Sequence, residues 1–440
     1  MNPESPPSRP LTYRGYERPQ VAEPDTYLTS VRKGTPGGEY LRRFWHPVGF
    51  VHELKDVPVR VKALGEDLVI FRDGGGHIGC LHLHCAHRRT SLEFGIVSDK
   101  GLRCCYHGWR FDVDGTILDI PGQSDIAKIS ARISQGAYPV HVKAGLVFVY
   151  MGPPEKTPPF PDFERFNLAG VTSVPNEVRF PYPCNWVQVK ENAMDPAHTA
   201  VLHAIPQMRS NTEHFANEFG VFPVFTAMPT PNGMMYVASR KVGDKVWVRS
   251  TEYISPTVHG VGSNVESGAQ VKSCTAPYRT TWTLPVDDDY SINFCVSHIQ
   301  DGDTTPPEQR EYQERFGQTD ERPYRERQLI PGDYDAMVSE GPVNVHALEN
   351  LAASDVGVVL FRRILRREIQ NVERGEDPAP FQTPIRTYCN NRVVPVADVA
   401  GDANDPAVLR ELARQVGESY LVRPPLMDWE APSGKEVVTA

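Results

Sequence analysis

The stretch CAHRRTSLEFGIVSDKGLRCCYHGW occupies residues 85–109 and contains two Cys–His pairs. The first pair is Cys85-x-His87, and the second is Cys104-x-x-His107. Sixteen residues separate the pairs, which is enough for a hairpin that brings two loop tips together. Thiolates and imidazoles are both metal ligands. The spacing therefore predicts a metal centre held between two loops.

The kind of metal centre follows from how the ligands are distributed. Zinc sites usually take two cysteines from one short motif and two histidines from another. Here each loop supplies one Cys and one His, which favours a Rieske [2Fe-2S] cluster, with two thiolates on one iron and two imidazoles on the other. A structural zinc site remains the alternative. Four nearby residues are rival ligands by spacing: Cys80, His82, His84 and Cys105.

The composition is that of an ordinary globular protein of 440 residues with a formal net charge of −9. The absence of a Lys/Arg-rich block argues against nucleic acid or an anionic membrane as a partner. The first ten residues, MNPESPPSRP, lack the apolar core of a signal peptide. We therefore expect a cytoplasmic protein, in which the eight cysteines are reduced and the clustered ones are metal ligands.

Three segments are expected along the chain. Residues 1–46 form a Pro-rich arm followed by a helix near 36–46, and residues 47–155 form an all-β domain. Residues 156–440 form an α+β domain with an antiparallel sheet, because strand-like runs such as GMMYVASRKV at 233–242 and KVWVRSTEYI at 245–254 are mixed with helical patterns. The clearest helix begins after Ser354, a candidate cap, and ends at Gly375.

A second constellation is Asp195-Pro-Ala-His198-x4-His203. Two imidazoles and a carboxylate with open positions form the facial triad of non-haem Fe(II) oxygenases, although His pairs on helices are more often structural. Residues five apart on a regular helix point about 140° apart. We therefore predict a π-bulge, a break or a helix end between His198 and His203, and a regular helix through residue 203 would count against the pairing.

The runs CAHRRTSLEFG and LRCCYHGWRFDVDG resemble the signature of Rieske non-haem iron oxygenases. That family usually has Gly after the His-Arg pair, where this chain has Arg89. The resemblance implies that Cys85 and Cys104 bind one iron and that His87 and His107 bind the other. It also implies a helix-grip, START-like catalytic domain beside the cluster domain.

The segment NWVQVKENAMDPAHTAVLH resembles the mononuclear-iron segment of the same family. This implies that His198 and His203 bind iron, while Asp195 hydrogen-bonds His198 and, across a subunit boundary, His107 of the partner subunit. The segment SEGPVNVHALENLAASDVGVVLFRRIL resembles the phthalate dioxygenase and aromatic O-demethylase branch, which implies Asp355 as the third ligand. Four nearby acids are interpreted as decoys rather than as ligands: Asp333, Asp335, Glu340 and Glu349.

The resemblance implies the terminal oxygenase of a multi-component system. O₂ is the co-substrate, and a separate reductase or ferredoxin brings electrons from NADH, because no Gly-x-Gly-x-x-Gly motif follows a strand in this chain. The implied assembly is a homotrimer, alone or in stacked trimers, and the substrate is a small aromatic acid that is O-demethylated or hydroxylated.

Three other functions remain open from the sequence. They are a cis-dihydroxylating phthalate-type dioxygenase, a hydroxylase of another substrate class and a plain Rieske electron carrier. Arg209, Arg240 and Arg249 are possible carboxylate anchors, but solvent-facing arginines are the commoner case, so none is assigned to the site.

Overall fold

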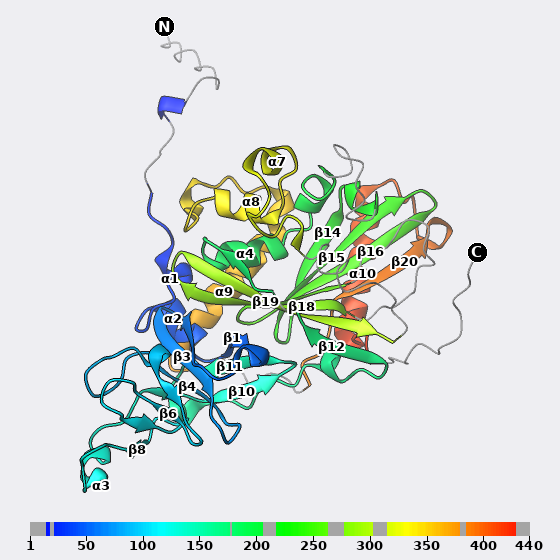
Figure 1. Ribbon diagram of the computed structural model, residues 1–440. Helices are drawn as coiled ribbons and strands as arrows, with labels where there is room; N and C mark the ends of the chain where they lie inside the picture. Colours follow the sequence, from blue (N-terminus) through cyan, green and yellow to red (C-terminus); the bar gives the residue numbers. More distant parts are fainter. Residues whose placement is uncertain are drawn as a thin grey trace.

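The structure, a computed structural model, describes residues 15–17, 22–176, 178–205, 217–262, 277–301, 315–378 and 384–427. Figure 1 shows a small β domain, coloured blue to cyan, beside a larger body built around one long twisted sheet. The predicted α+β class is confirmed. None of the described helices has the length and apolar character needed to cross a bilayer.

The arm ends in two short helices rather than one. They are α1 (Thr26–Thr29) and α2 (Pro36–Leu41). Thr35 caps α2 by accepting a hydrogen bond from the Gly38 N–H, and Pro36 occupies the first turn, where its missing N–H costs nothing. The helix expected near 36–46 therefore ends earlier, because the chain turns into a strand at Trp45. Most of the expected arm lies outside the described residues.

The small domain consists of three antiparallel sheets. The first has the order β1-β11-β10 (Trp45–Phe50, Leu146–Tyr150, Val140–Lys143). The second has the order β2-β3-β4-β9 (Val59–Ala63, Glu66–Arg72, Ile78–His82, Ala137–Tyr138). The third has the order β5-β6-β7-β8 (Ile96–Val97, Leu102–Arg103, Arg110–Phe111, Ile117–Asp119), and α3 (Ile126–Ser130) follows it.

The larger body is built on a nine-stranded antiparallel sheet. Its main path is β12-β19-β18-β17-β16-β15-β14, with β13 paired to β19 and β20 paired to β16. The bounds are Val171–Pro175 (β12), Phe180–Tyr182 (β13), Val224–Thr230 (β14), Gly233–Val242 (β15), Lys245–Ile254 (β16), Val258–Gly262 (β17), Pro277–Asp287 (β18), Tyr290–Gln300 (β19) and Asn390–Pro395 (β20). The two expected strands at 233–242 and 245–254 are confirmed residue for residue.

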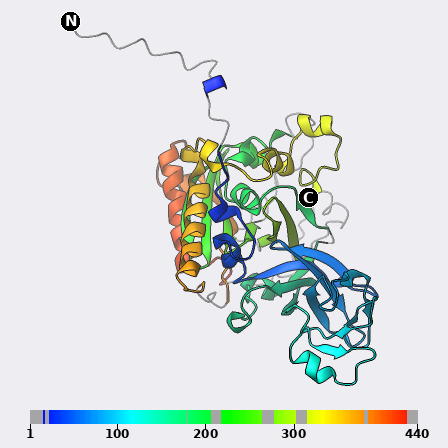
Figure 2. The same cartoon turned by 90° about the vertical axis from the view of Figure 1, so that its left-hand side faces the viewer.

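Helices cover both faces of this sheet. Met234 and Tyr236 of β15 pack in one core with Phe361 of α9 (Val356–Glu373). Met235 and Val237, which alternate with them, pack in a second core with α10 (Pro406–Val422). Successive side chains of a strand point to opposite faces of the sheet. The side chains of β15 therefore pack alternately against α9 and α10. Figure 2 shows α9 in orange and α10 in red at one end of the sheet.

The expected long helix is confirmed as α9, and the left-handed Gly375 follows its last turn as predicted. Ser354 does not cap it, because α9 begins after Asp355, which itself closes a short 3₁₀ turn. Helix α10 was not predicted, although Asp405 accepts a hydrogen bond from Ala407 N–H at its start and Pro406 opens it.

The small domain and the larger body share their main core. Val48 and Phe148 belong to the same buried cluster as Trp282 of β18, and the Phe148 and Trp282 rings meet edge to face at 5.5 Å. The boundary predicted at 155/156 therefore stays a prediction, since the main buried cluster contains residues from both sides of it.

The two Cys–His loops share one backbone design. In the first, Cys85 N–H bonds Thr90 O at 2.9 Å and Arg89 N–H bonds Cys85 O at 2.9 Å. In the second, Cys104 N–H bonds Trp109 O at 2.8 Å and Gly108 N–H bonds Cys104 O at 3.1 Å. Arg89 and Gly108 occupy equivalent positions, four residues after the cysteine of each loop. Both adopt a left-handed backbone conformation, with φ of 66° and 76°. Glycine adopts that conformation freely and arginine does not.

Replacement of Arg89 by glycine should therefore stabilise the cluster domain. A non-glycine residue in the left-handed conformation destabilises the folded state by roughly 1–2 kcal/mol. Glycine removes this strain, but its greater freedom in the unfolded chain offsets about 0.4–1 kcal/mol of the gain. We expect Arg89→Gly to raise the thermal midpoint of the domain slightly, measured by loss of the visible absorption of the purified protein.

The matched control is Arg88→Gly. Arg88 is also exposed but does not have a positive φ, so this change should lower the midpoint or leave it unchanged. A midpoint that falls in Arg89→Gly as much as in Arg88→Gly would show that the strain at residue 89 is negligible.

Candidate functional site

The first site lies where the two Cys–His loops meet. The thiols of Cys85 and Cys104 are buried, with 2% and 3% exposure, and they are direct neighbours. Burial, followed by the nearby Cys104, raises the pKa of Cys85 to about 11. The imidazoles of His87 and His107 are exposed and their ring centroids lie 4.7 Å apart. The structure thus brings all four predicted ligands together, with the sulfurs inward and the imidazoles outward.

Two further residues support these loops, and one of them, Gln135, was not found from the sequence. Gln135, which is buried, accepts a hydrogen bond from Ala86 N–H at 2.7 Å and donates to the carbonyls of His82 and His84 at 2.8 and 3.2 Å. Trp109 stacks on the His87 ring at 4.8 Å with an interplanar angle of 3°. Gln135 lies far from both motifs in sequence, so no local pattern marked it.

The rival ligands lie elsewhere. Cys80 is buried in β4 and belongs to the main core, whereas Cys85 and Cys104 belong to the core of the small domain. His82 lies 3.3 Å from the Tyr138 hydroxyl, and the Nδ1 atom of His84 lies 3.0 Å from the Arg89 carbonyl. Cys105 is exposed. The arrangement favours the predicted set over each rival.

The second site begins where helix α4 (Trp186–Ala193) ends. Asn185 caps its start by accepting a hydrogen bond from Val187 N–H, and the helix stops two residues before Asp195. His198–Ala200 then form a 3₁₀ turn, followed by irregular turns to Ala204. The predicted break between His198 and His203 is confirmed, and their Nε2 atoms lie 3.2 Å apart.

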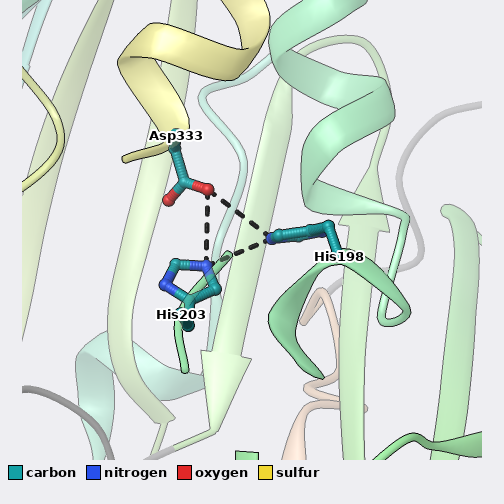
Figure 3. A group of neighbouring side chains, drawn as sticks. All are labelled: His198, His203 and Asp333. Atoms are coloured by element: carbon teal, nitrogen blue, oxygen red, sulfur yellow. Dashed lines mark hydrogen bonds and ion pairs between the residues drawn. The ribbon is translucent and has the colours of Figure 1, made fainter. Parts of the chain in front are cut away.

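A carboxylate completes this group, and it belongs to Asp333 (Figure 3). Its Oδ1 atom lies 3.5 Å from His198 Nε2 and 3.3 Å from His203 Nε2. Burial opposes ionisation of Asp333, but the two imidazoles outweigh it and hold the pKa of the carboxyl well below its usual range. Burial likewise opposes protonation of His198, and the carboxylates of Asp195 and Asp333 raise its pKa nonetheless.

Asp333 is held in place from several directions. It opens helix α8 (Asp333–Ser339), and Gln318 donates a 2.6 Å hydrogen bond to its Oδ2 atom. Tyr182 in turn donates to Gln318 at 2.6 Å. A Cβ on Gly332 would lie 2.2 Å from the Cα of Gly317, so only glycine permits this approach of the two backbones.

The structure differs from the sequence prediction for the third ligand. The carboxylate of Asp355 accepts a hydrogen bond from Ala352 N–H just before α9 and is not part of the group around the two imidazoles. The physical reason is that a helix-initiating acid can satisfy the free N–H groups of its own turn. The other three acids have separate partners: Asp335 with Arg327, Glu340 with Asn344, and Glu349 with Arg362.

Asp195 lies on the outer side of His198. Its Oδ1 atom accepts a 2.7 Å hydrogen bond from Ala197 N–H, and its Oδ2 atom lies 3.4 Å from the Nδ1 atom of His198. The carboxylate therefore touches the ring nitrogen that faces away from Asp333. This fits the predicted contact between Asp195 and His198, while the contact with His107 of the partner subunit remains a prediction.

Comparison with known proteins bears on both sites. The sequence profile of the Rieske [2Fe-2S] domain matches residues 44–130. The chain is 40% identical to the tert-butanol monooxygenase / tert-amyl alcohol desaturase oxygenase subunit of Aquincola tertiaricarbonis, over 92% of this chain and 90% of that protein. It is 36% identical to the phenoxybenzoate dioxygenase subunit alpha of Ectopseudomonas oleovorans, over 81% and 87% of the two chains.

Among solved structures, dicamba monooxygenase bound to dicamba superimposes with a TM-score of 0.57 at 17% identity, over 77% of this chain and 99% of that one. This likeness concerns the fold. The similarity in sequence extends over nearly the whole chain, and the chain carries two groups of side chains that are typical metal ligands. The protein is therefore a member of the Rieske non-haem iron oxygenases, in the branch of the phthalate dioxygenase and O-demethylase subunits.

Proposed function

We propose that this chain is the terminal oxygenase of its system and that His198, His203 and Asp333 hold a mononuclear Fe(II). The observation that carries the proposal is the approach of three ligand atoms to within 3.2–3.5 Å of one another. Three ligands on one face of an octahedral ion, each at about 2.1 Å, lie about 3 Å apart. The residues present therefore fit the facial triad.

We further propose that Cys85 and Cys104 bind one iron of the [2Fe-2S] cluster and that His87 and His107 bind the other. The opposite burial of the two residue types supports this assignment, since the exposed imidazoles give the cluster a side open to a partner. When bound, the cluster supplies single electrons and the mononuclear iron activates O₂. The chain contributes orientation through Gln135 at the first site and through Gln318 at the second.

The carboxylate ligand can be tested directly by iron content. Asp333→Asn removes the anionic oxygen that faces both imidazoles, so the protein should keep its cluster iron and lose the mononuclear iron. Asp355→Asn is the matched control and should keep both. The measurements are total iron and acid-labile sulfide. Loss of the mononuclear iron in Asp355→Asn, with full iron in Asp333→Asn, would make Asp355 the ligand instead.

Electron delivery is proposed to cross between subunits. In both Figure 1 and Figure 2 the part of the small domain that carries β6, β8 and α3 lies at the opposite end of the molecule from α8, which carries Asp333. A path within one chain would therefore be long. A head-to-tail homotrimer, closed as a ring, would bring the exposed His107 of one subunit to Asp195 of the next.

Asp195 is proposed as the bridge in that path. A carboxylate between two imidazoles orients both rings. We expect Asp195→Ala to leave the visible spectrum of the cluster and the iron content intact while turnover falls by about 10- to 100-fold, the typical loss when a supporting partner of a metal ligand is removed. The measurement is single-turnover reoxidation of the reduced cluster with substrate and O₂. Reoxidation at the wild-type rate would remove the bridging role.

The electron donor is proposed to be a separate NADH-dependent reductase, with or without a ferredoxin, in the cytoplasm. The substrate is proposed to be a small aromatic acid that is O-demethylated or hydroxylated, in keeping with the names of the phenoxybenzoate and dehydrodivanillate relatives. A neutral aliphatic alcohol is the second candidate, because the relative with 40% identity is named for tert-butanol.

A further inference from the structure

Two arginines lie inside the protein next to the second site. The strand register pairs Arg240 of β15 with Trp247 of β16, and Ala238 with Arg249. Residues paired across antiparallel strands point to the same face, so Arg240 and Arg249 share one face of the sheet. They are 1% and 7% exposed. The expectation that these arginines face solvent is therefore wrong, while Arg209 lies outside the described residues.

An aromatic ring connects both arginines to the iron-ligand segment. The guanidinium carbons of Arg240 and Arg249 lie 5.6 and 5.3 Å from the centre of the Phe219 ring. The same ring lies 6.3 Å from the His203 imidazole. The two positive charges are thus one aromatic ring away from a proposed iron ligand.

Arg240 supports the ligand segment itself. Its Nη2 atom donates to Thr199 Oγ1 at 2.8 Å and to Pro196 O at 3.3 Å, and its Nε atom donates to Val221 O at 3.0 Å. Burial, and after it the neighbouring Arg249, lowers the pKa of Arg240 to about 10. Arg240 is therefore a positioning residue for the turn between His198 and His203.

Arg249 uses fewer of its hydrogen-bond donors than Arg240 does. Its Nη2 atom donates to Gly262 O at 3.2 Å, and its Nη1 atom makes only a 3.5 Å contact with Thr251 Oγ1. Its Nε atom is buried and makes no hydrogen bond with any residue that the structure describes. A guanidinium buried with an unused donor leaves a free-energy cost that a planar oxyanion could offset.

The other buried arginines show what is unusual here. Arg165 is paired with Glu252, and Arg42 is paired with Glu66. Within the described part of the chain, neither Arg240 nor Arg249 forms an ion pair with an Asp or Glu. Burying a charge without a counter-charge is strongly unfavourable. Among the described residues, that cost is compensated at Arg42 and Arg165 but not at Arg240 and Arg249, the two beside the iron site.

We propose that Arg249, with Arg240 beside it, binds the carboxylate of the substrate. This rests on the proposed function and adds that the substrate is an anion, held by its carboxylate on the side of the site where Phe219 contacts His203. Arg249 offers the unused donor, and Arg240 adds positive charge while it holds the ligand turn. A neutral alcohol or amide would leave both charges uncompensated, so the site would discriminate against it.

The test measures binding without turnover. Titration calorimetry of the iron-loaded protein without reductase would use benzoate, 3-methoxybenzoate and 3-phenoxybenzoate, each against its neutral amide. At least one acid should bind at least about 30-fold more tightly than its amide, and Arg249→Met should abolish that preference, because removal of one partner from a buried charge pair costs about 2 kcal/mol or more. Arg249→Lys should retain part of it.

Arg392→Gln is the matched control. Arg392 lies on the adjacent strand β20 but is exposed, so this change should leave the preference intact. Thermal unfolding separates binding from structure: Arg249→Met should keep or raise the midpoint of the ligand-free protein, because it removes an uncompensated buried charge.

Three results would overturn the proposal. They are amides that bind as well as all the acids, an acid preference that survives in Arg249→Met, and a lower midpoint in that variant, which would indicate an internal counter-charge. Acid binding that depends on Arg249 but leads to no oxidation with reductase, NADH and O₂ would instead contradict the proposed function and leave the anion site standing.

Discussion

The early end of helix α4 is the constraint on which the second site depends. On a continuous helix His198 and His203 would point about 140° apart. Because α4 stops at Ala193 and a 3₁₀ turn follows, the two Nε2 atoms come within 3.2 Å of each other. The interrupted backbone needs support from side chains, and it receives it from Asp195, which accepts the Ala197 N–H, and from Arg240, which donates to Pro196 O.

The two cluster loops also position their ligand side chains through a special backbone conformation. Each loop places a buried thiol and an exposed imidazole at a fixed spacing, and each needs one left-handed residue to close. Gly108 meets that need without strain, whereas Arg89 does so at a cost. The outcome is asymmetric, with sulfur ligands inside the domain and imidazoles at its surface. That asymmetry suits electron exit through a histidine towards a neighbouring subunit.

Much of this could be predicted because the signals are local. Cys85, His87, Cys104 and His107 lie within 23 residues of one another, and the strand-like runs of β15 and β16 were visible in the sequence. Asp333 could not be chosen over Asp355, because both are acids at helix starts far from the histidines, and only tertiary packing through Gly317 and Gln318 distinguishes them. The burial of Arg240 and Arg249 was equally invisible, since arginine in a strand usually faces solvent.

The central claim is that electrons pass from the cluster of one subunit to the iron of the next. It is tested by mixed trimers of two inactive variants, Cys104→Ala, which lacks the cluster, and His198→Ala, which lacks the mononuclear iron, purified through two different tags. In a closed head-to-tail ring every mixed trimer contains one working junction. The account predicts about one third of the wild-type rate of product formation per trimer, whereas no activity in the mixed trimers would contradict it.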